Sequence, residues 1–178
     1  MDIFKTIATR RSTRKFTERQ ISDADLQTIL KAGWAAPIGH SAYNKMQLNV
    51  IQDKDVLEKL DVHCTAAWGN PNYHMFYQAP TLIVVSGYTA EDEDVRIADT
   101  GCVMENMHLA ATALGLGSIY LWAMVRRIPQ DPEFIKLLGL PEGFSPLSVL
   151  AVGYPETPWP ERDLDEIPEN RIPTRILK

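Results

Sequence analysis

The spacing of apolar residues along the chain predicts a mixture of helices and strands. Apolar side chains three to four residues apart, the spacing of one helix face, are found in five segments: 2–9, 22–36, 56–60, 97–114 and 134–138. Apolar runs typical of strands are found in four: 46–51, 80–85, 118–122 and 146–153. In the first of these strands polar residues alternate with apolar ones, so we expect it at the margin of the sheet.

Polar and small residues mark where these elements begin and end. Ser22 followed by Asp25 is typical of a helix N-terminus, and this helix is expected to stop at Pro37. The longest uncharged stretch, residues 109–125, approaches the length of a membrane span, but Gly115 and Gly117 interrupt it. We interpret this stretch as the end of a helix followed by a buried strand, and we expect no membrane partner.

Length and composition predict one domain. The chain has 178 residues, of which 45% are apolar and 23% charged, which is enough for one sizeable core. We therefore expect residues 1–178 to form a single domain whose proline-rich tail, 155–178, is not regular helix throughout. The sparse cysteines, Cys64 and Cys102, and the lack of an uninterrupted apolar run at the N-terminus favour a cytoplasmic protein.

Positive charge is concentrated near the N-terminus. Residues 1–16 carry a net charge of +4, whereas the rest of the chain carries −9. Arg10, Arg11 and Arg14 are permanently charged donors and Ser12 adds a hydroxyl, a combination that suits a phosphate. Composition alone would favour a solvated basic turn. Because nucleic acids are bound through broad positive surfaces, one compact cluster on an acidic chain favours a small phosphate ligand over a nucleic-acid partner.

Two motifs resemble the nitroreductase family of flavin enzymes. A short amphipathic helix is followed by Arg-Arg-Ser-x-Arg-x-Phe at residues 10–16, and Ala-Leu-Gly-Leu-Gly-Ser stands at 113–118. The glycines of the second motif follow a helix instead of preceding one, so it is not a dinucleotide-binding fingerprint. The resemblance implies an α+β, nitroreductase-like fold with a central mixed, mostly antiparallel sheet flanked by helices. It also implies an intertwined homodimer with FMN sites at the interface, in which the tail 155–178 wraps the partner.

The same resemblance implies which residues contact ligands. Those expected to bind the FMN cofactor are Arg10, Arg11, Ser12, Arg14, Pro37, Ile38, Gly39, Asn72, Trp122, Ala123 and either Arg175 or Arg171. Those expected to line the substrate pocket are His40, Tyr43, Tyr73 and Trp122. The chain departs from the family pattern at four places: Ile38 replaces a serine, no Gln-Pro-Trp follows the loop 37–44, Met75 stands where a pocket lysine is expected, and Trp122-Ala123 replaces Glu-Gly.

The resemblance further implies reduction of nitroaromatics, quinones or similar small acceptors by NADH or NADPH, through hydride transfer at flavin N5 in a ping-pong cycle. Hydride delivery leaves negative charge at the pyrimidine edge of the flavin, and Arg14 is our candidate to stabilise that charge. No side chain is needed as a nucleophile or general base. The four histidines are dispersed without metal-ligand spacing, so we expect no metal.

Two other functions stay open on the sequence. A flavin-binding storage or sensor protein without efficient turnover would fit the missing pocket lysine and the tryptophan at position 122. A polyanion-binding protein would use residues 10–15, and its binding would depend strongly on salt.

Overall fold

The computed structural model describes residues 1–70, 72–90, 93–122 and 132–178. Its helices are α1 (Ile3–Thr9), α2 (Asp23–Trp34), α3 (Lys54–Trp68), α4 (Glu93–Ala113) and α5 (Pro132–Leu138). Its strands are β1 (Met46–Ile51), β2 (Thr81–Tyr88), β3 (Gly117–Leu121) and β4 (Phe144–Gly153). Short 3-10 turns are formed by η1 (Gly39–Ser41), η2 (Tyr43–Lys45) and η4 (Leu164–Glu166). The predicted α+β class is confirmed.

The four strands form one sheet in the order β1-β2-β4-β3, and each neighbouring pair is antiparallel. Strand β1 therefore lies at an edge, as its alternating pattern predicted. The sheet is mostly antiparallel, as expected, and a parallel element enters only as an isolated bridge between Ser12 and Ser118 among the described residues.

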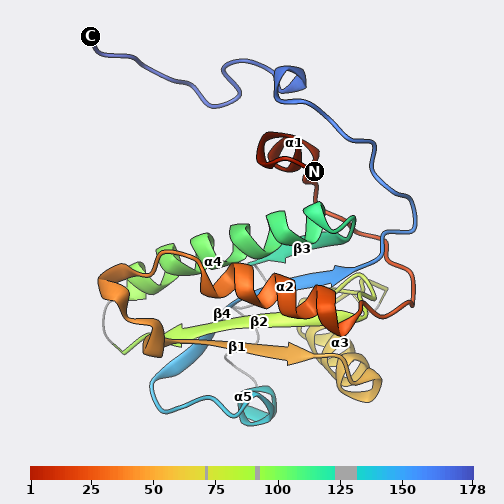
Figure 1. Cartoon of the computed structure of the whole chain (residues 1–178). Helices are drawn as coiled ribbons and strands as arrows, with labels where there is room; N and C mark the ends of the chain where they lie inside the picture. The colour runs from red at the N-terminus through yellow and green to blue at the C-terminus, as the bar shows by residue number, and fades with distance from the viewer. Residues whose placement is uncertain (71, 91–92, 123–131) are drawn as a thin grey trace.

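The central strands β2 and β4 are buried on both faces, which explains why their sequences read as continuous apolar runs. Alternate side chains of β2 enter different cores: Leu82 and Val84 pack into one, Ile83 and Val85 into the other. Helices α3 and α5 contribute to the first core, whereas α2 and α4 cover the second (Figure 1). The sheet thus lies between two helical layers.

Local chemistry sets the helix ends. The Ser22 hydroxyl accepts the Asp25 N–H at 3.1 Å and caps α2, as predicted. Asp53 caps α3 in the same way, accepting the Val56 N–H at 3.0 Å. Helix α3 ends at Gly69, whose φ of 79° is the left-handed conformation that glycine adopts without steric cost. Each boundary thus has an identifiable residue behind it.

Several predicted boundaries differ from the structure. Helix α3 continues to Trp68, well beyond the predicted 56–60, because the buried Cys64 extends its apolar face into the core. Helix α4 begins at Glu93 instead of residue 97, since acids are favoured in a first helical turn. The 109–125 stretch contains the end of α4 and then β3, as interpreted from the sequence. No helix in the described ranges is both long and apolar enough to cross a bilayer.

The C-terminal tail crosses the chain's own N-terminal helix before it leaves the body of the molecule. Lys5 of α1 pairs with Glu161 at 3.0 Å, and the Arg162 N–H donates to the Thr9 hydroxyl at 3.0 Å. The Arg162 guanidinium also donates to the carbonyl oxygen of Ala8. Beyond η4 the chain extends away from the sheet and helices (Figure 1). That its end wraps a partner subunit stays a prediction.

Candidate functional site

The basic segment, residues 10–16, is held in an extended conformation beside the sheet. The Thr13 N–H donates to the Ser118 carbonyl oxygen of β3 at 2.9 Å, and Phe16 bridges Pro155 just after β4. Thr13 and Phe16 are buried, whereas Arg14 and Lys15 are exposed. Backbone pairing at Thr13 and Phe16 therefore holds these two side chains inward, and the charged Arg14 and Lys15 between them are directed outward.

Gly117 allows the close approach of the basic segment to β3. A Cβ atom at this position would lie 2.6 Å from Oγ1 of Thr13 and 2.7 Å from its Cγ2. Any larger side chain would push the basic segment away from the strand. The second glycine of the Ala-Leu-Gly-Leu-Gly-Ser motif thus has a direct part in placing the first motif.

Arg10 points toward α4. Its Nε lies 3.4 Å from Oε1 of Glu105, and one helical turn further along α4 the buried His108 shares a hydrogen bond of 3.0 Å with the Ser118 hydroxyl. Burial raises the pKa of Glu105, and the Arg10 charge acts in the opposite direction. Burial, together with the charge of Arg10, lowers the pKa of His108 from 6.5 to about 4. His108 is therefore neutral at physiological pH.

Two adjoining cavities flank the basic segment. One, of about 220 Å³, is lined by Ser12, Thr13, Arg14, Lys15, Pro155, Glu156, Thr157 and Trp159. The other, of about 280 Å³, is lined by Arg14, Lys15, Phe16, Tyr73, His74, Tyr77, Gln78 and Glu156. Because Arg14 and Lys15 line both cavities, the structure brings a predicted phosphate-binding segment and the predicted pocket residue Tyr73 to one place.

The aromatic wall of the second cavity is ordered by a hydrogen bond. The hydroxyl groups of Tyr73 and Tyr77 lie 2.8 Å apart, and their rings pack edge to face. The hydrogen bond with Tyr77 and partial burial raise the pKa of Tyr73, so this tyrosine stays protonated at neutral pH. It can therefore donate as well as accept a hydrogen bond.

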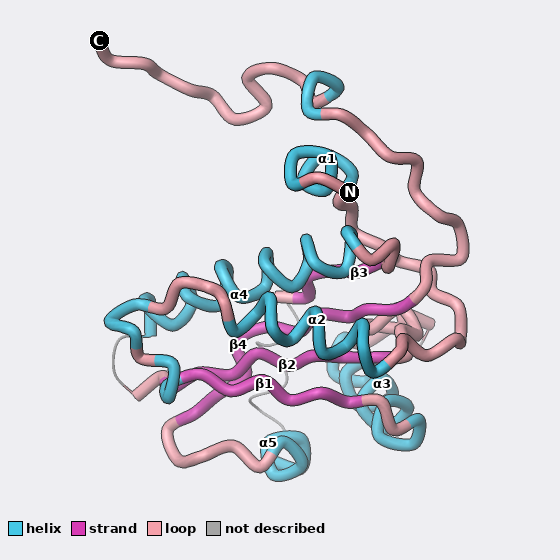
Figure 2. Tube along the Cα trace, in the orientation of Figure 1, coloured by secondary structure: helices cyan, strands magenta, loops and turns pink. Residues whose placement is uncertain are grey.

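The loop 37–44 lies at the opposite end of the sheet (Figure 2). It leads into Met46 at the start of β1, which pairs with Gly87 near the end of β2. The basic segment instead pairs beyond the end of β4, where Val152 faces Thr81 at the start of β2. At about 3.3 Å per residue, the six steps from Thr81 to Gly87 place these two ends roughly 20 Å apart. One chain therefore does not bring Pro37, Ile38, Gly39, His40 and Tyr43 to the basic segment.

The remaining predicted residues are distributed as follows. Arg11 stacks over the Trp159 ring at 5.1 Å, so it contacts the tail. Asn72 is exposed in the turn that precedes Tyr73, and Trp122 is 45% exposed just after β3. Arg171 and Arg175 are exposed and belong to the tail, which beyond η4 extends away from the sheet and helices (Figure 1). Ala123 lies outside the described residues.

Comparison with known proteins decides the family. Residues 7–154 match the family described as the nitroreductase family. The chain belongs to the nitroreductase family. The match includes the basic segment, both motifs and all four strands, so the resemblance carried by residues 10–16 and 113–118 is confirmed.

Relatives and solved structures in the nitroreductase family resemble the chain over most of its length. A protein of Archaeoglobus fulgidus, provisionally named NADH dehydrogenase/NAD(P)H nitroreductase, is 34% identical over 98% of this chain and 96% of its own. The FMN reductase [NAD(P)H] of Bacillus subtilis is 30% identical over 86% of this chain and 66% of its own. A nitroreductase of Bacteroides fragilis solved with bound FMN is 28% identical, covers both chains completely and superposes with a TM-score of 0.84.

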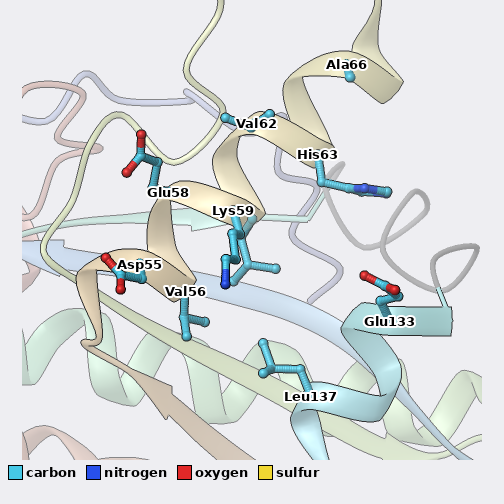
Figure 3. A pocket seen from close by; sticks show the side chains of 10 residues that line it. Asp55, Val56, Glu58, Lys59, Val62, His63, Ala66, Glu133 and Leu137 are labelled. Atoms are coloured by element: carbon cyan, nitrogen blue, oxygen red, sulfur yellow. The ribbon is translucent and has the colours of Figure 1, made fainter.

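A larger cavity in the described part of this nitroreductase lies elsewhere, between α3 and α5 (Figure 3). It measures about 880 Å³, and acids and bases share its lining: Asp55, Glu58, Lys59, His63 and Glu133. None of its lining residues belongs to the basic segment or to the loop 37–44. Size alone would therefore point to a place away from the predicted phosphate-binding residues.

Among the cavity-lining residues that sequence reasoning missed, three make contacts or carry charge that bear on the site. Lys15 was counted only as charge, although it lines both cavities. Tyr77 was not singled out from its aromatic-rich neighbourhood, and its four-residue spacing from Tyr73 was the available signal. Trp159, whose Nε1 donates to the Thr13 hydroxyl at 3.2 Å, comes from the tail, and no pattern in the sequence links it to residue 13.

Proposed function

We propose that this nitroreductase family member is an FMN-dependent oxidoreductase that uses NADH or NADPH to reduce small planar acceptors such as nitroaromatics and quinones. The observation that carries this proposal is the meeting of Ser12, Arg14 and Lys15 with Tyr73 around two adjoining cavities. Its relatives named FMN reductase and NAD(P)H nitroreductase support the same chemistry. Neither cysteine is joined in a disulfide within the described chain, which is consistent with a reducing compartment, and we place the protein in the cytoplasm.

The residues at these cavities fit an FMN molecule. A phosphate needs hydrogen-bond donors and positive charge, which Arg10, Ser12 and Lys15 of the basic segment provide on an otherwise acidic chain. A flat ring needs an apolar or aromatic wall with polar groups at its edge, which the Tyr73–Tyr77 pair provides. The solved relatives from Bacteroides fragilis and Desulfitobacterium hafniense both contain bound FMN.

Each residue has a proposed task. Bound FMN would supply the redox chemistry, taking a hydride from the pyridine nucleotide in one half-reaction and passing it to the acceptor in a second. Arg10 and Ser12 hold the phosphate, and Glu105 keeps the Arg10 guanidinium oriented from the side of α4. Arg14 stabilises negative charge at the pyrimidine edge, while Asn72 and the backbone at Trp122 hold the ring.

We propose that the working site needs two copies of the chain. The loop 37–44 and the basic segment lie at opposite ends of the sheet, so the loop can reach a ligand at the basic segment only in a second subunit. Apolar side chains of α1 and of the tail are exposed in the single chain: Ile3, Phe4, Ile7, Ile172, Ile176 and Leu177. A homodimer would remove this surface from water. Arg175 or Arg171 would then reach the partner's phosphate site.

The cofactor assignment is tested by measuring FMN affinity in Arg10→Ala and Ser12→Ala. Each change removes a charged or hydroxyl donor to the phosphate, so FMN should bind about tenfold more weakly or worse, as measured by quenching of flavin fluorescence. Arg19→Ala is the matched control, because Arg19 stacks over the Tyr154 ring and lines neither cavity. Colourless wild-type protein that ignores added FMN would contradict the assignment.

A flavin-binding protein without turnover is the alternative that particular residues favour. Met75, at the position where the family has a lysine, is 2% exposed and belongs to the core, so it brings no charge to the cavity. The exposed ring of Trp122 adds bulk at the end of β3. Anaerobic addition of NADH or NADPH separates the two functions: rapid bleaching of the flavin supports the oxidoreductase, and resistance to bleaching supports storage or sensing.

A further inference from the structure

A buried ion pair of α4 binds the backbone of the loop 37–44 at Gly39. Nη1 of Arg96 lies 2.9 Å from Oδ2 of Asp99, and the two side chains are only 4% and 8% exposed. The Gly39 N–H donates to Oδ1 of Asp99 at 2.7 Å, and Nη2 of Arg96 donates to the Gly39 carbonyl oxygen at 3.4 Å. Both polar backbone groups of one residue are therefore bound by one ion pair.

The contact is close enough to require glycine. A Cβ atom on Gly39 would lie 2.7 Å from Cγ1 of Val95 and 3.4 Å from Oδ1 of Asp99. The loop backbone lies so close to α4 at this point that a side chain at position 39 has no room. The loop thus rests directly on the first turns of α4.

The residues that follow the gripped glycine have unusual backbone conformations. His40 and Ser41 have φ values of 58° and 52°, in the left-handed region that side chains other than glycine seldom adopt. Backbone bonds close the turn around them: the Ser41 N–H donates to the Ile38 carbonyl oxygen at 2.9 Å, and the Ala42 N–H to that of Gly39 at 3.2 Å. Strain of this kind persists only where surrounding contacts over-determine the backbone.

Stability alone is a weak reason for such a pair. Two charges removed from water lose hydration, and replacing a buried pair with apolar residues of similar size often leaves stability unchanged. What the pair does specifically is to hold Ile38 inward and to leave Pro37 and His40 exposed. Gly39 itself has no free polar backbone group for a ligand, so the exposed neighbours are the residues that can contact one.

We propose that Arg96 and Asp99 are positioning residues that hold Pro37 and His40 against an electron acceptor bound at the partner subunit's flavin, and thereby set which planar acceptors bind. This inference rests on the proposed function. Because the pair fixes a loop and touches no reacting group, its loss should weaken acceptor binding far more than it slows turnover.

The variant that tests the proposal is the double substitution Arg96→Met with Asp99→Leu, which removes both charges and keeps similar volume. Asp99→Asn is the second variant, since its amide oxygen can still accept the Gly39 N–H. The matched control is Thr100→Val, a nearly isosteric change at a buried position next to Asp99 in α4 whose hydroxyl has no hydrogen-bond partner in the described chain.

Two measurements are made on each full-length protein. Amide hydrogen exchange of residues 38–42 without added FMN reports how firmly the ion pair holds the loop. Steady-state kinetics with 1,4-benzoquinone and nitrofurazone report whether the loop affects acceptor binding. In the double variant we expect exchange to speed up at least tenfold, KM for both acceptors to rise at least fivefold with different factors for the two, and kcat to stay within threefold. Asp99→Asn should show smaller shifts in the same direction, and Thr100→Val none.

The remaining outcomes each overturn the proposal. Unchanged exchange in both variants means that the ion pair does not hold the loop. Faster exchange with unchanged KM values means that the loop does not position acceptors. A lower melting temperature with unchanged exchange and unchanged KM values means that the ion pair has only a structural role. A wild-type protein without FMN binding or turnover overturns the proposed function, and this inference with it, before any variant is compared.

Discussion

At the scale of single residues, the basic segment divides its charges among different tasks. Arg10 faces Glu105, Arg11 stacks on Trp159, and Arg14 alone of the three arginines lines both cavities. Equal charges in the sequence thus acquire different surroundings in the fold. Arg14 is therefore the arginine that we propose contacts the flavin ring.

The proposed task of Arg14 predicts a change in redox potential. Arg14→Gln removes a positive charge near the pyrimidine edge, which should destabilise reduced flavin by about 1 to 2 kcal/mol at a partly exposed site. For a two-electron couple this lowers the midpoint potential of bound FMN by about 20 to 40 mV. Spectroscopic titration against a reference dye measures it. Arg19→Gln should leave the potential unchanged, and equal potentials in all three proteins would contradict the assignment.

His108 predicts a specific pH dependence of stability. Its pKa is about 4 in the folded protein, against 6.5 when exposed, so between these values the unfolded chain takes up a proton that the folded chain does not. The contribution of His108 to the free energy of unfolding should therefore be complete above pH 6.5. As the pH drops to about 4, the free energy of unfolding should fall by roughly 3 kcal/mol on account of this residue. Urea unfolding of wild type and His108→Leu at several pH values measures this dependence. The free energy of unfolding of the variant should fall by roughly 3 kcal/mol less than that of the wild type over the same pH range. Parallel pH curves would contradict the prediction.

At the scale of elements, the sequence predicts where a helix is capped but not how far its packing extends it. Ser22 and Asp25 predict the start of α2, and the structure has the expected hydrogen bond between the Asp25 N–H and the Ser22 hydroxyl. The length of α3 was underestimated, because whether residues such as Cys64 continue a helical face depends on the core they meet. Caps are interactions within a few residues, whereas helix length is settled by tertiary contacts.

The cap of α2 predicts a measurable loss of stability. Ser22→Ala removes the acceptor for the Asp25 N–H, which should lower the free energy of unfolding by about 1 kcal/mol. Gln27→Ala, an exposed position on the same helix, should change it by less than about 0.5 kcal/mol. Urea unfolding at pH 7 compares the two, and similar values for both would show that the cap contributes little.

At the scale of the whole molecule, the fold leaves the proposed site in two pieces. The loop 37–44 and the basic segment are separated by the length of the sheet, and the tail beyond η4 has left the body of its own chain (Figure 1). A second copy is the simplest source of the missing half, because a two-fold axis supplies both halves twice.

Truncation after residue 167 tests the place of the tail. Removing residues 168–178 deletes the exposed Ile172, Ile176 and Leu177, each of which could contribute about 1.5 to 3 kcal/mol if buried on a partner. The dimer dissociation constant, measured by sedimentation, should rise at least tenfold. Far-ultraviolet circular dichroism should be unchanged, since the removed residues contain no helix or strand. An unaltered dissociation constant would contradict a wrapping tail.

The sequence by itself determined the α+β class, the edge position of β1, the central apolar strands and the family. These follow from periodicity and short motifs, which act between residues close in the chain. Only the tertiary structure decided that Lys15, Tyr77 and Trp159 line the cavities, that His108 is buried and neutral, and that an Arg96–Asp99 pair holds Gly39. These depend on contacts between segments far apart in the sequence, and on burial, which shifts a pKa or changes the effect of a charge only after the chain has folded.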